Sequence, residues 1–289
     1  DEETRPSSHR FRCIMMMTLL YLIASVQAIG PVDDPDMWWR FRTGQWIIEN
    51  HSIPTEDYFS RPAMGQPWIE YSWMFELLIY WTYALFDLPG VMYGVVLMAL
   101  LITFASHRLV RVFELPITLE VALVAAAMGA IKPLITPRPW LFTILLFSVE
   151  LLIIDRARYS ARPKQLWILP VIFILWANIH IQFVYGLAVL GLLLIESVVV
   201  ISFRRHGVCL QTNELQPRDV IPVLIACVLA SLLTPYHFFL YKQVFDYVVH
   251  TGAFLTISEL HPMLFRSPDS WLILLLTLGA AFILGWRRR

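Results

Sequence analysis

Long apolar runs recur along the whole chain, and they constrain its fold more than any other feature. Four of the clearest cover residues 13–30, 90–107, 140–155 and 183–203. A helix needs about 20 residues to cross a hydrocarbon core of ~30 Å. Because lipid offers no hydrogen bonds to an exposed backbone, a run of this length is expected to cross as a helix. The sequence therefore predicts an all-α integral membrane protein.

The composition supports this fold class and argues against several functions. Of the 289 residues, 58% are hydrophobic and only 15% are charged, whereas soluble domains carry about 25% charged residues. The formal net charge is zero, so nucleic-acid binding has no electrostatic support. Cys13, Cys209 and Cys227 are too far apart to match a metal-binding spacing, and we expect them to fill apolar space.

We expect about eight transmembrane helices in a single transmembrane domain, residues 1–289. Both termini would then lie in the cytoplasm. Residues 31–89 would form a first outer loop, and residues 234–270 a second outer segment. The expected spans cover residues 13–30, 90–107, 117–131, 140–155, 167–181, 183–203, 220–233 and 271–286.

The apolar stretch 71–86 is left out of that count because of where the basic residues fall. If it does not cross, fifteen of the 22 Lys and Arg residues lie on the cytoplasmic side. If it crosses, everything after it changes side and the bias is reversed, against the positive-inside rule. We therefore expect residues 71–86 to rest in the outer leaflet.

The first outer loop opens with three carboxylates, Asp33, Asp34 and Asp36, and continues into a segment rich in Trp that ends near Asn50. Aromatic residues mixed with charges are typical of a helix lying at the membrane–water interface. The Asp34–Pro35–Asp36 spacing is able to offer oxygens to a divalent cation such as Mg²⁺ or Mn²⁺, or to supply a general base. The alternative is a solvated acidic loop that caps the helix.

A basic segment follows at residues 132–140, where Lys132 and Arg138 stand among prolines. A guanidinium near the headgroup plane suits a phosphate or a pyrophosphate. The alternative for Arg138 is an anchor whose long side chain reaches the interface.

Polar residues also occur at other expected outer ends. Asn178 and His180 must find partners or face a cavity if they lie at membrane depth, and Glu259 and His261 could supply a second acid or base. The alternative for Asn178 and His180 is a hydrogen bond in helix packing. The alternative for Glu259 and His261 is an ordinary solvated loop. Glu150 and Glu196 are expected to reach the cytoplasmic interface with long side chains.

Taken together, DPDMWWRFRTGQWI, PRPWLF, LWANIHIQF and LLTPY resemble segments of bacterial multi-spanning proteins of the GT-C glycosyltransferase superfamily, over about residues 31–236. That resemblance implies a catalytic acid in the first outer loop, matched here by Asp36 with Asp34 beside it. It also implies a location in a bacterial inner (plasma) membrane and a polyprenyl-phosphate sugar donor in the membrane lipid. Arg138 and Lys132 would hold the phosphate, and Asn178, His180, Glu259 and His261 would line the cavity.

The chain departs from the family pattern at the loop between the expected third and fourth spans. Several GT-C enzymes place a second acid there, and this chain has Lys132 and Arg138 instead. The alternative function is therefore a non-catalytic membrane subunit with a degenerate GT-C module, which scaffolds protein partners in a larger complex.

Overall fold

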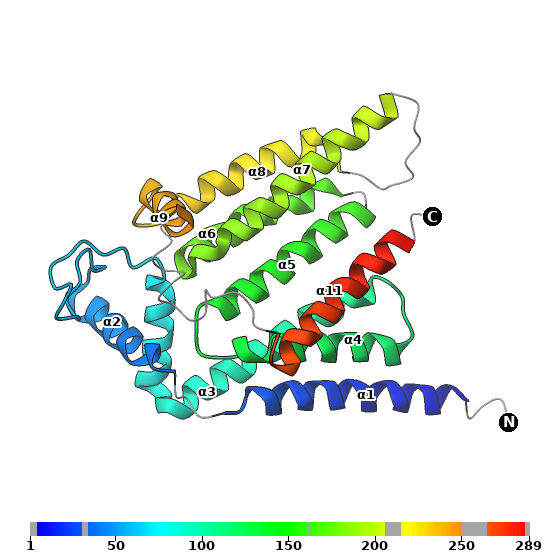
Figure 1. The fold of residues 1–289 in the computed structure, drawn as a ribbon, viewed down its shortest axis with the longest axis horizontal. Coiled ribbons are helices and arrows are strands. Elements are labelled where there is room, and N and C mark those ends of the chain that lie inside the picture. Colours follow the sequence, from blue (N-terminus) through cyan, green and yellow to red (C-terminus); the bar gives the residue numbers. More distant parts are fainter. Residues whose placement is uncertain (1–4, 31–33, 161, 206–214, 250–264, 287–289) are drawn as a thin grey trace. The chain divides into compact units, whose positions relative to one another are not determined.

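The structure, a computed structural model, describes residues 5–30, 34–160, 162–205, 215–249 and 265–286. Every regular element in these ranges is a helix (Figure 1), which confirms the predicted all-α class. The α-helices are α1 (Arg5–Ala28), α2 (Asp36–Asn50), α3 (Trp73–Arg111), α4 (Ile117–Ala130), α5 (Trp140–Tyr159), α6 (Leu169–Ile179), α7 (Val184–Arg205), α8 (Pro217–Ser231), α9 (Phe238–Val249) and α11 (Pro268–Trp286). Short 3₁₀ helices η1 (Lys132–Leu134), η2 (Pro163–Ile168) and η3 (Ile181–Phe183) join some of them.

The chain divides into two compact units. The first contains residues 1–33, 91–137 and 251–289, and the second contains residues 34–90 and 138–250. In the first unit, α4 packs against both α1 and α11. The second unit holds α2, the beginning of α3 and α5 to α9. The single transmembrane domain stays a prediction.

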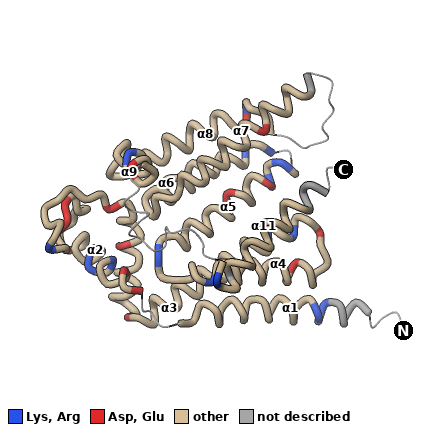
Figure 2. The backbone as a smooth tube through the Cα atoms, viewed as in Figure 1, with Lys and Arg blue, Asp and Glu red and all other residues tan. Residues whose placement is uncertain are grey.

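Three helical segments are long and apolar enough to cross a membrane, namely Arg10–Ala28, Trp73–Arg111 and Ile181–Phe203. Three shorter apolar helices cover Ile117–Ala130, Pro163–Ile179 and Ser270–Phe282. Long stretches of α6, α7 and α8 carry no Lys, Arg, Asp or Glu (Figure 2). These segments support a membrane protein, and the total of eight spans and their sidedness stay predictions.

Helix α3 is interrupted at Asp87, whose φ of 56° and ψ of −163° are not helical. Pro89 follows two residues later and cannot donate a backbone hydrogen bond. The part before the break, Trp73 to Phe86, is roughly 21 Å long at 1.5 Å per residue, which is less than the ~30 Å of a hydrocarbon core. The break lies where the sequence predicts one, between residues 86 and 90.

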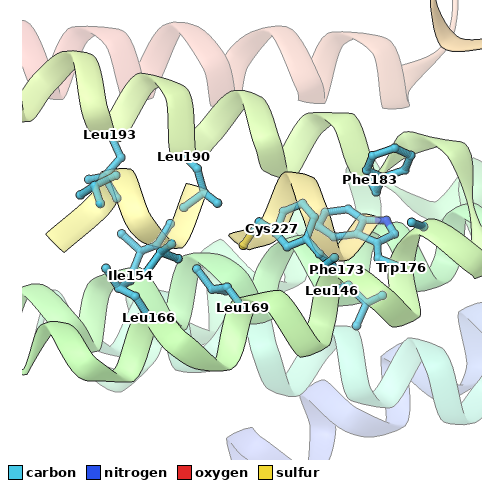
Figure 3. Packing of buried hydrophobic residues seen from close by; sticks show 14 of the residues in the cluster. Leu146, Ile154, Leu166, Leu169, Phe173, Trp176, Phe183, Leu190, Leu193 and Cys227 are labelled. Carbon is cyan, nitrogen blue, oxygen red and sulfur yellow. The ribbon is translucent and has the colours of Figure 1, made fainter. Parts of the chain in front are cut away.

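The apolar core of the second unit is built around α6, in which Leu169, Phe173 and Trp176 are completely buried. Side chains from α5, α7 and α8 surround them, including Leu146, Leu190 and Cys227 (Figure 3). Burying large apolar and aromatic side chains contributes about 1.5–3 kcal/mol each. The core includes Leu146 of α5, the helix that begins two residues after Arg138.

Helix α2 packs one face against the first part of α3. Its buried residues recur every three or four positions, as expected for a helix with one covered face. At Gly44 an added Cβ would lie 2.2 Å from the carbonyl oxygen of Glu76 and 2.6 Å from Cβ of Tyr80. One turn away, the rings of Phe41 and Tyr83 stack with centroids 4.4 Å apart. The two helices therefore approach closely only because residue 44 has no side chain.

We predict that Gly44→Ala lowers the stability of the purified protein by about 1–3 kcal/mol, the usual cost of forcing extra atoms into a packed contact. Gly94→Ala is the matched control because nothing lies within 4 Å of its added Cβ, and alanine favours a helix by about 1 kcal/mol over glycine. Thermal unfolding in detergent measures both variants. Equal melting temperatures for the two would contradict the close α2–α3 contact.

Candidate functional site

Asp34, Asp36 and Arg138 come together in the second unit, although 104 positions separate Asp34 from Arg138. Nε of Arg138 lies 2.5 Å from Oδ2 of Asp34, and its Nη2 lies 2.9 Å from Oδ1 of Asp34. The same Nη2 lies 3.1 Å from Oδ2 of Asp36. Asp36 begins α2, and Arg138 stands two residues before α5 begins at Trp140. The structure therefore brings the acidic motif and this arginine together, and their roles stay predictions.

The two carboxylates differ in their surroundings. The side chain of Asp34 is 7% exposed and that of Asp36 is 41% exposed. Asp34 also accepts a hydrogen bond from the backbone N–H of Asp36, at 3.0 Å. Burial alone would raise the pKa of Asp34, but the hydrogen bonds from Arg138 and from that N–H outweigh it and lower the pKa. Asp34 is thus held as an anion that fixes Arg138.

Asp36 is the carboxylate of this cluster that remains open to a ligand. The alternative predicted for the acidic loop was that it caps the helix. Asp34 does part of this, because it accepts a hydrogen bond from the backbone N–H of Asp36 at the start of α2. That arrangement leaves the side chain of Asp36 with the longer contact to Arg138 and with the greater exposure. An exposed carboxylate beside a guanidinium is able to accept a proton from a bound hydroxyl group.

The donor set fits a divalent cation poorly. Both oxygens of Asp34 accept hydrogen bonds from Arg138, and the guanidinium would repel a cation placed between the two carboxylates. Within the described ranges, no three His, Cys, Asp or Glu side chains gather as metal ligands. The predicted Mg²⁺ or Mn²⁺ therefore stays a prediction, without support from this geometry.

A second charged network lies along the next turn of α2. Nη1 of Arg40 is 2.5 Å from Oε1 of Glu76, and both residues are buried. The guanidinium carbon of Arg40 also lies 4.6 Å from the centre of the Trp39 ring. Glu70 is 3% exposed, and burial raises its pKa to about 7 although the charge of Arg40 opposes that rise. These residues were not predicted to form a site. The sequence feature that indicates one is the position of Arg40, which falls on the apolar face of α2.

Asn178 and His180 are both buried, and contacts within the protein engage the side-chain amide of Asn178 and Nδ1 of His180. Oδ1 of Asn178 accepts from Nε1 of Trp73 at 2.9 Å, and its Nδ2 donates to the carbonyl oxygens of Ile174 and Leu233. Nδ1 of His180 lies 2.8 Å from Oγ1 of Thr143. These contacts are those of helix packing, the alternative that the sequence left open, and the role of the two residues in substrate binding stays a prediction.

The remaining predicted residues do not join this cluster in the described structure. Lys132 is exposed and belongs to the first unit. Glu259 and His261 lie outside the described residues. The predicted roles of all three therefore rest on the sequence alone.

The two acidic residues that were expected to reach the cytoplasmic interface, Glu150 and Glu196, behave differently from each other. Glu196 is half-exposed and pairs with Arg158, as expected for a side chain that reaches the interface. Glu150 is completely buried, and neither of its oxygens has a hydrogen-bond partner among the described atoms. The expectation that Glu150 extends to the interface is wrong because it points into the core, where Oε2 lies 2.5 Å from the position of a Cβ on Gly186.

No family model matches the chain, and neither a curated protein nor a solved structure is similar to it.

We predict that Asp34→Asn lowers the stability at pH 7 by about 1–3 kcal/mol, because it removes the carboxylate that accepts hydrogen bonds from both Nε and Nη2 of Arg138. The pKa of Asp34 is lower in the folded protein than in the unfolded chain. Its contribution is therefore complete above the unfolded value of about 3.9 and is lost as the pH falls through the lower folded value.

Melting temperatures recorded from pH 7 to pH 3 measure this effect. The gap between wild type and Asp34→Asn should be constant down to about pH 5 and should close below about pH 4. Glu56→Gln, which alters an exposed carboxylate of the same loop, should show no such gap. A gap that widens as the pH falls would contradict the assignment.

Proposed function

We propose that this protein is a GT-C-type glycosyltransferase that moves a sugar from a polyprenyl-phosphate donor to an acceptor hydroxyl at the outer membrane–water interface. The observation that carries the proposal is the contact of Arg138 with both Asp34 and Asp36. In this proposal Asp36 acts as the general base and Arg138 binds the phosphate, and the two side chains lie 3.1 Å apart. The motif resemblance of residues 31–236 supplies the reaction class.

In the proposed step, the acceptor oxygen attacks the anomeric carbon of the donor sugar. The bond between that carbon and the phosphate oxygen breaks, and polyprenyl phosphate leaves with the bonding electron pair. Asp36 accepts the proton of the acceptor hydroxyl and later releases it to water. Arg138 stabilises the negative charge that develops on the departing phosphate, and Asp34 positions Arg138 through two parallel hydrogen bonds.

The proposal requires the first outer loop to stay on one side of the bilayer. The estimated 21 Å length of the Trp73–Phe86 part of α3 supports this, as does the distribution of basic residues. In the proposed topology of about eight spans, with both termini in the cytoplasm of the inner membrane, α2 rests at the interface. The donor would approach within the leaflet and the acceptor from the aqueous side.

A second candidate is a non-catalytic subunit that scaffolds protein partners. The observation that favours it is the internal use of Asn178, whose side-chain amide donates and accepts three hydrogen bonds within the protein. The engagement of Arg138 by two carboxylates also fits a purely structural ion pair. The two candidates differ in what they predict for Asp36, because a scaffold does not need a partly exposed carboxylate there.

We predict that Asp36→Asn lowers kcat by about 10²–10⁴, the usual contribution of a general base, with a small change in KM for the donor. The amide keeps the shape of the side chain but is too weak a base to take the proton. The measurement uses the purified chain in lipid nanodiscs with a panel of polyprenyl-phosphate sugars, and follows release of polyprenyl phosphate together with transfer of labelled sugar.

Arg138→Lys completes this test because lysine keeps the charge but loses the paired hydrogen bonds, so KM for the donor should rise. Arg61→Gln is the control, since Arg61 is an exposed basic residue of the same loop, and its kinetics should match wild type. Wild-type rates in Asp36→Asn, or no release from any donor by the wild-type protein, would favour the scaffold.

A further inference from the structure

A cavity of about 490 Å³ opens beside the second charged network, entirely within the second unit. Its volume falls within the roughly 300–1,000 Å³ typical of sites for small ligands. Its wall combines aromatic rings, from Trp39, Phe59, Trp68, Tyr71 and Tyr247, with the polar side chains of Arg40, Asp57, Ser60, Glu70 and Ser72. None of these residues belongs to the Asp36–Arg138 cluster.

Buried polar atoms in this wall lack partners within the described structure. They are Oε2 of Glu70, Oγ of Ser72 and Nε of Arg40. The side chain of Glu70 is engaged on one side only, where Oε1 accepts from the backbone N–H of Ser72 at 3.1 Å. A buried polar group without a partner typically costs about 1–3 kcal/mol. The oxygens of Glu70 and Ser72 are able to accept a hydrogen bond from a ligand hydroxyl group, and Nε of Arg40 is able to donate one. A ligand that offers both donors and acceptors would therefore satisfy all three atoms.

The aromatic side chains form a connected surface. The centroids of Trp39 and Trp68 lie 5.9 Å apart, and Phe59 meets Trp68 edge-on at 5.8 Å. Both tryptophans are only partly buried, so their rings are not fully covered by protein. The face of an aromatic ring is electron-rich and attracts weakly positive C–H groups.

The charges of the wall decide among ligand classes. An organic cation would be attracted by Glu70 and the rings but repelled by Arg40, which already lies over Trp39. A phosphate or carboxylate would be repelled by Glu70 and Asp57. A purely apolar ligand would leave the three buried polar atoms unpaired. A neutral molecule with C–H faces and many hydroxyl groups meets every one of these demands, because each hydroxyl donates and accepts.

We propose that this cavity binds a saccharide, with its ring faces against Trp39 and Trp68 and its hydroxyl groups on Glu70, Ser72 and Arg40. Arg40 follows Asp36 by four positions in α2, so the two side chains are neighbours on one face of the helix. The identification of this saccharide as the acceptor rests on the proposed glycosyltransferase function. The binding of a saccharide does not.

The test measures saccharide binding to the full chain in lipid nanodiscs by saturation-transfer NMR and titration calorimetry. The probes are methyl α-mannopyranoside, methyl β-glucopyranoside, maltose and cellobiose, with tetramethylammonium as a cationic probe. We expect at least one saccharide to bind and tetramethylammonium not to bind. Trp68→Ala should weaken that binding about tenfold, the equivalent of ~1.4 kcal/mol.

Two further variants separate loss of binding from loss of folding. Ser72→Ala removes a buried hydroxyl that has no hydrogen-bond partner among the described residues, so it should weaken saccharide binding several-fold while the melting temperature stays equal or rises. Trp38→Ala is the control for Trp68→Ala, since Trp38 is 55% exposed and does not line the cavity. Its affinity should match wild type.

The outcomes also separate this proposal from the proposed function. Saccharide binding that depends on Trp68 and Ser72, in a protein that releases no polyprenyl phosphate, supports the cavity and refutes the transferase. Transfer that depends on Asp36, with saccharide affinity unchanged in Trp68→Ala and Ser72→Ala, refutes the cavity and leaves the transferase. Binding of tetramethylammonium in place of every saccharide would likewise overturn the proposal.

Discussion

The buried ion pair between Arg40 and Glu76 is the interaction on which the candidate site depends. It joins α2 to the first part of α3 at 2.5 Å, next to Gly44, where the two helices come closest. Removing one partner of a buried pair typically costs about 3–5 kcal/mol because the other charge is left uncompensated. The pair therefore holds α2 in place, and α2 in turn carries Asp36 at one end and Trp39 on the wall of the cavity.

The sequence predicted the parts of this arrangement that follow from local chemistry. Apolar length indicated helices, and the distribution of basic residues separated the stretch 71–86 from the span that begins near residue 90. The same distribution predicted that the acidic motif and Arg138 lie on one side of the membrane, but it did not predict their direct contact. The number of spans and the activity stay predictions, because they depend on a bilayer and on a substrate.

The rest could not be predicted because it depends on tertiary contacts. Nothing local distinguishes Asp34 from Asp36, yet the packing of α5 places Arg138 so that it takes both oxygens of one and touches only one oxygen of the other. Glu150 was expected near an interface, but α6 and α7 enclose it. The cavity combines residues 39, 68 and 247, and only the return of α9 to the first loop brings Tyr247 close to Tyr71, with ring centroids 6.2 Å apart.

The balance of charge links the two proposed sites. Five carboxylates, those of Asp34, Asp36, Asp57, Glu70 and Glu76, accompany the two guanidiniums of Arg40 and Arg138 in the two sites, and full ionisation would leave a surplus of negative charge that repels a phosphate. Burial raises the pKa of Glu70 to about 7, so this carboxyl is largely protonated below neutral pH and the surplus is smaller there. A protonated Glu70 is also able to donate to a saccharide hydroxyl. Protonation of Glu70 thereby weakens the repulsion of an anionic donor that approaches Arg138, and it adds a hydrogen bond for a neutral ligand. This is a physical reason for the two sites to lie side by side along α2.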